Sequence, residues 1–264
     1  FSAGIDFESK IMVKPDAALL LRRHFDNEKY KPESITLSGN TDCYQPGERK
    51  LKITRSLLQV MLEYKNPVSI ITKNSLILRD IDLLSELAAL NLVHVMISIT
   101  SLKNDLRLLL EPRTVTAKNR LIAVEQLSKR NIPVGVMTAP IIPGLNSDEI
   151  PALIKAAADA GAVTAGYTVV RLNGEIKNIF HDWLYTNLPD AADKIWNQIK
   201  ACHNGQVNDS RFKLRMSGDG QIAESIKQLF LVSKRKYMGN KKMPEYDFSL
   251  FKRPLRNGMQ LKMF

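Results

Sequence analysis

Polar side chains that could do chemistry stand where β-branched runs of this sequence end. They offer hydroxyl, carboxylate and ammonium groups, in chain order Ser38, Thr41, Asp42, Lys73, Ser98 and Thr100. Hydroxyls and carboxylates bind polar small molecules, and lysine supplies either a point charge or a nucleophilic amine. Polar residues at the C-terminal ends of parallel strands line one mouth of an α/β barrel, where such folds keep their active sites. An enzyme is therefore the leading interpretation.

Six β-branched runs must position these groups, and helix-patterned segments separate them. Successive runs begin about 25–40 residues apart, the length of one βα unit. They cover residues 11–14, 35–39, 68–73, 93–100, 133–140 and 163–170. Strands that alternate with helices predict a parallel sheet with right-handed crossovers. Six units are too few for the usual eight-unit barrel, so we predict an α/β fold with a partial, open parallel (β/α)6 TIM-like barrel.

The helical patterns divide the chain into three parts. Residues 1–173 form the predicted barrel core, and residues 174–237 a helical extension packed on it. Residues 238–264 lose periodicity and are rich in Gly, Asn, Pro and Lys, which predicts a basic extended tail. Ser147 and Asp82 are the predicted N-caps of two barrel helices, and Gly161 the stop of the first.

Composition sets the class of protein. Of the 264 residues, 44% are hydrophobic and 25% charged, typical of a globular domain, and no run of 18 apolar residues occurs, which predicts no membrane span. Cys43 and Cys202 are the two cysteines, which fits a reducing cytoplasm, and no Cys or His pair has metal-ligand spacing. We expect a cytoplasmic monomer. The net charge of +11 lies mostly at residues 234–264, where nine Lys/Arg and two Asp/Glu give +7.

Four ordered segments resemble a known enzyme family. They are residues 37–46 with Glu48-Arg49, residues 71–74, residues 95–100 with 110–114, and residues 139–146. Together they resemble the radical S-adenosylmethionine (SAM) family, in the branch related to spore photoproduct lyases. The resemblance covers roughly residues 1–235. Any one segment alone would be weak evidence for the resemblance, but the four segments in this order are specific to the family.

The resemblance implies SAM and a [4Fe–4S] cluster as cofactors. It places Lys73 at the methionine carboxylate, and Ser38, Thr41 and Asp42 near the rest of the methionine. The ribose or carboxylate is in reach of Ser98, Thr100 and Arg113. Ile142 and Pro143 form an apolar shelf for adenine, with Gly144 permitting close backbone approach. Glu111 and Arg113 could instead form an ordinary ion pair.

The family holds its cluster on a Cys-x3-Cys-x2-Cys loop, which is absent from this chain. The resemblance implies that the loop lies just upstream of Phe1, so we expect the metal ligands there and none within these residues. Cys43 and Cys202 cannot replace it, since a cubane needs clustered thiolates. Cys43 is instead a candidate hydrogen donor, with core packing as the alternative. Spore photoproduct lyases carry their donor cysteine at the position that corresponds to Gly39, so photoproduct repair is not our preferred reading.

Three functional classes remain open on the sequence. The first is a radical SAM enzyme of unknown substrate with a possible link to DNA. The others are an ordinary barrel lyase that forms a Schiff base on Lys73, and a non-catalytic barrel that binds nucleic acid. The chain end (Gln260, Leu261, Met263 and Phe264) resembles the short peptide with which bacterial DNA-repair proteins dock on the sliding clamp. The alternative is that these apolar residues fold back onto the barrel.

Overall fold

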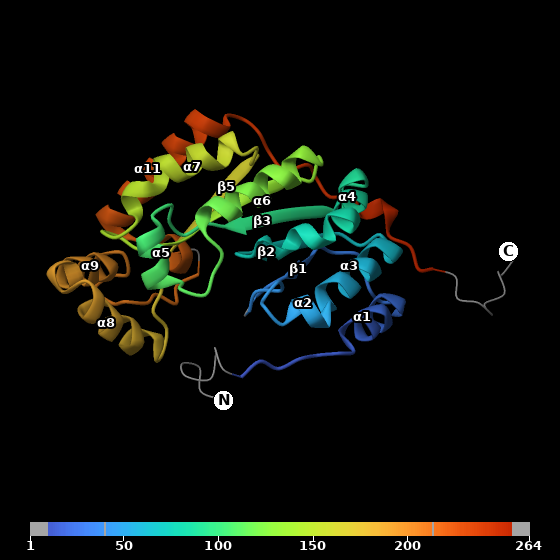
Figure 1. Ribbon diagram of the computed structural model, residues 1–264, viewed down its shortest axis with the longest axis horizontal. Helices are drawn as coiled ribbons and strands as arrows, with labels where there is room; N and C mark the ends of the chain where they lie inside the picture. Colours follow the sequence, from blue (N-terminus) through green and yellow to red (C-terminus); the bar gives the residue numbers. More distant parts are fainter. Residues whose placement is uncertain (1–9, 40, 213, 255–264) are drawn as a thin grey trace, which may run out of the picture.

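A five-stranded, all-parallel sheet organises the computed structural model, which describes residues 10–254 except 40 and 213 (Figure 1). The strands are β1 (Ile35–Leu37), β2 (Val68–Thr72), β3 (Val93–Ser98), β4 (Val134–Ile141) and β5 (Thr164–Val169). They lie side by side in sequence order, β1-β2-β3-β4-β5. The α/β class and the open parallel sheet are confirmed. All carboxyl ends of the strands lie at one edge, the mouth of the partial barrel.

Helices connect the strands and cover the sheet (Figure 1). Those of the barrel are α1 (Ala17–Asp26), α2 (Glu48–Leu51), α3 (Ile53–Tyr64), η1 (Ser75–Asp80), α4 (Ile81–Ala89), α5 (Asn104–Leu110), α6 (Ala117–Lys129), η2 (Ser147–Glu149) and α7 (Ile150–Asp159). Those after the barrel are α8 (Ile176–Asn187), α9 (Pro189–Ala201), α10 (Leu214–Ser217), α11 (Gly220–Met238) and η3 (Phe248–Leu250). Among the described helices, none combines the length and apolar character that a membrane span requires.

The first of the six predicted strands is wrong. Residues 11–14 have no regular structure, and Met12 is 81% exposed. No described strand pairs with them, so their β-branched side chains have no sheet surface to cover. Both predicted N-caps are wrong as well. Asp82 lies inside α4 and pairs with Arg55, and Ser147 begins a 3₁₀ turn before α7.

The main core lies between the sheet and the barrel helices. In β2 every second residue is buried, and Val68 and Ile70 are 0% exposed. The helices contribute buried side chains to the same core, among them Leu58 of α3 and Leu84 of α4. Each buried aliphatic side chain of this size stabilises the fold by about 1.5–3 kcal/mol. A second cluster joins the helices α8 and α9 to the loops after β4 and β5. It places both helices at the mouth, at the end of the molecule away from α1 (Figure 1).

The C-terminal strap, residues 239–254, runs across the opposite end of the barrel. The Tyr246 ring stacks on His94 at 3.9 Å, and its hydroxyl donates to Val68 O at 3.2 Å. Phe251 packs among Phe25, Tyr30 and Tyr64. These contacts lie at the amino ends of β2 and β3. The part of the tail up to residue 254 is therefore extended but packed on the barrel.

Candidate functional site

The loop after β1 is fixed to the end of β2 by Asp42. One carboxylate oxygen accepts from the Thr72 hydroxyl (2.7 Å) and from Tyr44 N (2.8 Å). The other accepts from Lys73 N at 2.7 Å. Ser38 adopts a φ of 84°, and its hydroxyl accepts from Cys43 N at 3.0 Å. That left-handed backbone costs about 1–2 kcal/mol for a residue other than glycine. These bonds fix residues 42–44 of the loop against Ser38 and the end of β2.

A buried ion cluster holds the far side of this loop. Asp80 is fully buried and binds both Arg55 (3.0 Å) and Arg79 (2.7 Å). It also accepts from the Tyr44 hydroxyl at 3.2 Å, while Glu48 pairs with Arg79 at 2.9 Å. All of these charges are paired within the cluster. We therefore assign it the role of positioning the loop.

Lys73 and Glu111 form the centre of the mouth. The Lys73 ammonium contacts one oxygen of Glu111, and the Thr100 hydroxyl donates to the same oxygen at 2.8 Å. The other oxygen accepts from Arg120, at 2.8 Å. The Lys73 side chain is 35% exposed, that of Glu111 10%, and that of Arg120 2%. The exposed end of this chain of charges is therefore an ammonium group.

Arg120 connects this network to the sheet. Its Nη1 donates to Ser98 O at 2.9 Å, and its Nε to Val115 O at 2.9 Å. Its Nη2 also donates to the Thr114 hydroxyl at 2.7 Å. A guanidinium presents five donors in one plane, so it can bind a carboxylate and two carbonyls at once. The strand end at Ser98 and the Lys73–Glu111 pair are thereby held together.

The charge of Glu111 is stabilised by its partners. Burial would raise the pKa of this carboxyl, but the charges of Lys73 and Arg120 and their hydrogen bonds lower it to about 2. Glu111 is therefore a fixed negative charge at neutral pH. It holds both cations in place.

The structure brings together Ser38, Asp42, Lys73, Ser98 and Thr100, the polar residues that the sequence placed at strand ends. Thr41 and Arg113 are exposed. The arginine that binds Glu111 at 2.8 Å is Arg120, which sequence reasoning missed. A signal was present, since Arg120 stands three residues after Ala117 and four before Val124. It therefore shares the buried face of α6, where an unpaired charge would be costly.

Ile142 and Pro143, the predicted adenine residues, lie in the turn after β4. Both are buried, and Ile142 is 2% exposed within the cluster that α8 and α9 complete. Gly144 has a φ of +78°, and a Cβ there would lie 2.6 Å from the Gln198 side chain of α9. The positive φ is what favours glycine at this turn, since the close Gln198 atom is the end of a flexible side chain. Ile142 thus packs within this cluster, and the adenine role of the turn stays a prediction.

Cys43 is half-buried beside the main core, and Cys202 is buried in another cluster. Burial raises the pKa of the Cys43 thiol to about 12, which keeps it protonated. Among the described residues, no group of three or more Cys, His, Asp or Glu is arranged to hold a metal ion.

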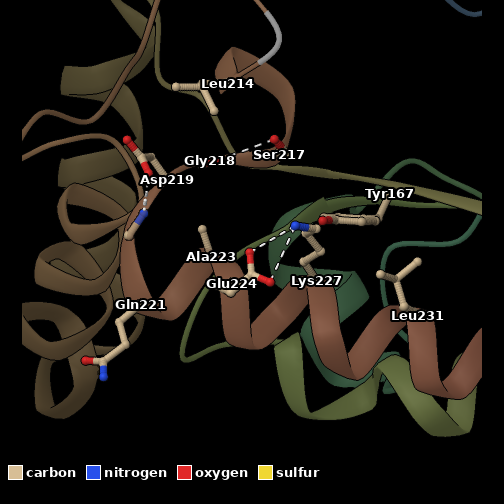
Figure 2. A pocket seen from close by; sticks show the side chains of 11 residues that line it. Tyr167, Leu214, Ser217, Gly218, Asp219, Gln221, Ala223, Glu224, Lys227 and Leu231 are labelled. Carbon is tan, nitrogen blue, oxygen red and sulfur yellow. Dashed lines mark hydrogen bonds and ion pairs between the residues drawn. The ribbon is translucent and has the colours of Figure 1, made fainter.

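A groove along the outer side of β5 is separate from these residues. Figure 2 shows Tyr167 of β5 facing α11 across it. The polar groups within it are paired with one another, Lys227 with Glu224 at 3.0 Å and Asp219 with Gly220 N at 2.8 Å. None of the residues predicted from the sequence lines it, and we assign it no ligand.

The family follows from the sequence of the barrel. Residues 6–157, more than half of the chain, match the family model of the radical SAM superfamily. The chain belongs to the radical SAM superfamily. The family implies an enzyme, and its members use SAM and a [4Fe–4S] cluster. The predicted likeness to this family is confirmed.

Proteins of distant organisms are similar to this radical SAM chain. An uncharacterized protein of Mycobacterium bovis is 28% identical over 196 residues, which are 74% of this chain and 58% of the relative. One of Methanocaldococcus jannaschii is 27% identical over 170 residues, 64% and 62% of the two chains. One of Acidianus two-tailed virus is 27% identical over 181 residues, 66% and 54% of the two chains. The chain thus spans less than two thirds of the length of each of these relatives.

Solved structures of spore photoproduct lyase share the fold. One mutant of that enzyme superposes with a TM-score of 0.61 at 13% identity, covering 87% of this chain and 66% of the lyase. Another, with bound AdoMet and a dinucleoside spore photoproduct, gives a TM-score of 0.55 at 13% identity, covering 84% and 64%. At this identity the likeness concerns the fold.

Proposed function

We propose that this protein is a radical SAM enzyme that binds SAM at the mouth of the partial barrel. With a [4Fe–4S] cluster it would cleave SAM reductively, and the resulting 5′-deoxyadenosyl radical would act on a further molecule. The observation that carries the proposal is the partly exposed side chain of Lys73, whose ammonium group is held at the strand ends by Glu111. Membership in the superfamily supports the choice of cofactor.

Lys73 is the proposed partner of the SAM carboxylate. Its ammonium has three donors, and Glu111 occupies one direction of approach. Glu111, Arg120 and Thr100 fix the direction in which the remaining donors point. A preformed charge of this kind costs less ordering entropy on binding than a free surface lysine.

The other strand-end residues have supporting roles in the proposal. Asp42 fixes the loop after β1 through its bonds to Thr72 and Lys73. In the proposal, Ser38 and Thr41 would face the methionine part of SAM. Ser98 and Thr100 would approach the ribose, and Arg113 the ribose or the carboxylate. Ile142 and Pro143 would contribute to an adenine site through the backbone of their turn, since their side chains are buried.

The cluster does not fit the cysteines of this sequence. A family cluster needs three thiolates, and the 264 residues contain two cysteines. Those two lie in different packing clusters. Cluster ligands would therefore have to come from outside these residues, and the proposed SAM cleavage applies only to a protein that carries them.

The test is SAM binding and cleavage by the full-length protein, reconstituted with iron and sulfide under anaerobic conditions. Lys73→Ala should weaken SAM binding about 10- to 100-fold, because a charge-assisted hydrogen bond contributes about 1.5–3 kcal/mol. Lys129→Ala removes an equally ion-paired lysine from the last turn of α6 and should leave affinity unchanged. If both variants bind SAM with the same affinity, Lys73 does not contribute to the SAM site. Absence of 5′-deoxyadenosine from the reduced wild-type protein would overturn the proposed activity.

The ion pair at Lys73 bears on the lyase alternative. Schiff-base chemistry needs an uncharged amine, whereas the contact with Glu111 suits a lysine that recognises an anion. Borohydride trapping of a carbonyl substrate on Lys73 would support the lyase instead.

We also propose that the chain end docks on a DNA sliding clamp, which would link the enzyme to DNA. Gln260, Leu261, Met263 and Phe264 lie outside the described residues, so the proposal rests on the sequence. In its favour, residues 234–264 carry a charge of +7. A few apolar anchors on a basic chain end suit pockets on a partner protein.

A further inference from the structure

Two segments far apart in sequence meet beyond the end of β5. The His203 ring places its Nε2 atom 2.7 Å from the carbonyl oxygen of Val170, the residue that precedes Arg171. The backbone N–H of Leu172 donates to the carbonyl oxygen of Val207 at 3.0 Å, and Val207 is the residue that precedes Asn208. The β5 strand ends at Val169, so this junction stands at the mouth edge of the sheet.

The junction contains three buried polar atoms that lack hydrogen-bond partners among the described residues. They are Arg171 Nε, His203 Nδ1 and Asn208 Oδ1. His203 as a whole is 1% exposed. Buried polar atoms are nearly always paired in folded proteins, so three at one junction indicate a place where a ligand completes the bonding.

The chemistry of the three atoms is complementary to a particular ligand. His203 Nε2 faces a carbonyl and so carries a proton, and when the ring holds a single proton its Nδ1 is an acceptor. Asn208 Oδ1 is a second acceptor, while Arg171 Nε is a charged donor. The matching ligand offers an anionic oxygen to the arginine and one or two hydroxyl donors to the acceptors.

Among the described residues, Arg171 also has no carboxylate partner. Its one described contact is a weak one, from Nη1 to the Met216 sulfur at 3.3 Å. Asp209 and Asp219, which are near Asn208 in sequence, both bind Arg211, at 2.6 Å and 3.1 Å. A partly buried guanidinium without a carboxylate partner favours the binding of an anion.

We propose that Arg171, His203 and Asn208 bind an anionic polyol, a phosphate or carboxylate group with a neighbouring hydroxyl, as part of the substrate. As a statement about substrate, this rests on the proposed function. Arg171 binds the anion, and the two acceptors select the hydroxyl. The predicted SAM residues follow the earlier strands β1 to β4, so the two ligands would occupy different parts of the mouth.

The experiment titrates the 264-residue protein with glycerol 3-phosphate, glycerate and glycerol by isothermal titration calorimetry. At least one of the two anions should bind. Binding of glycerol 3-phosphate alone would indicate a phosphate ligand, and binding of glycerate alone a carboxylate ligand. Glycerol should bind at least 10-fold more weakly than that anion. Arg171→Met and Asn208→Asp should each weaken anion binding at least 10-fold. The first removes the charge and the second, which is isosteric, adds a repelling carboxylate.

Arg235→Met is the matched control, because it removes an exposed arginine from the last turn of α11. It should bind as the wild type does. If the wild type binds neither anion, or if Asn208→Asp binds as tightly as wild type, the proposal is overturned. Binding needs no SAM cleavage, so inactivity of the reconstituted enzyme would leave this titration unaffected.

Discussion

Glu111→Gln tests the network at the mouth most directly. The substitution preserves the size of the side chain but removes the negative charge that Lys73 and Arg120 share. Arg120 is 2% exposed and would lose its only described carboxylate partner. We expect a large loss of stability, because removing one member of a buried ion pair leaves a charge without compensation.

The size of the effect can be worked out in two ways. Breaking a buried pair by removing one partner costs about 3–5 kcal/mol. The pKa of Glu111 falls from 4.5 to about 2 on folding, which corresponds to about 3 kcal/mol of stabilisation at neutral pH. Both routes predict that the free energy of unfolding falls by about 3 kcal/mol. Lys73 lowers the pKa of Glu111 more than Arg120 does, but the Lys73 side chain is 35% exposed, so solvent screening reduces its share of the loss.

The assay is urea unfolding of the 264-residue protein, followed by circular dichroism. For an m-value of about 3 kcal/mol/M, the midpoint should fall by about 1 M. Glu125→Gln is the matched control, since Glu125 pairs with Lys129 on the exposed side of α6. An exposed pair of this kind contributes about 0.3–0.5 kcal/mol. Equal midpoint shifts for the two variants would refute the network as a source of stability.

The pH dependence supplies an independent check. The folded pKa of Glu111 is below the unfolded one, so its stabilisation is fully present above about pH 4.5 and is lost as pH falls toward 2. At pH 3.5 the gap between wild type and Glu111→Gln should be about 1 kcal/mol smaller than at pH 7. A gap that stays constant between these two pH values would contradict the assigned ion pairs.

Three further predictions concern other parts of the chain. Phe251→Ala should lower the free energy of unfolding by about 2 kcal/mol, measured by urea unfolding, because its ring is enclosed by three aromatic side chains of the barrel; no change would mean that the strap adds no stability. Since burial raises the pKa of Cys43 to about 12, iodoacetamide should alkylate it at pH 8.5 at least ~100-fold more slowly than in urea, as followed by mass spectrometry. Fast labelling of the native protein would show an accessible thiolate. A peptide of residues 245–264 should recover the sliding clamp in a pull-down, and Leu261→Ala/Phe264→Ala should abolish recovery; equal recovery, or none from either peptide, would end the docking proposal.

The sequence was sufficient for the parts of the fold that depend on local pattern. β-branched runs at βα spacing predicted all five strands, because a strand buried on both faces needs apolar side chains whatever surrounds it. The strand-end positions of Asp42 and Lys73 followed from the same pattern. Parallel strands bring their carboxyl ends to one edge, so residues 31 positions apart could be expected to meet, and they do at 2.7 Å.

Only the tertiary structure decided which side chains pair. The helical pattern of α6 places Arg120 on a buried face, but it does not say which carboxylate Arg120 binds, because that depends on how this face packs against the loop after β3. Likewise, the pairing of His94 with Pro244 spans 150 residues and requires the C-terminal strap to cross the barrel. The run at residues 11–14 had the composition of a strand but lacks a described neighbour to pair with. A strand is a property of two segments, so its existence is settled by what lies beside it.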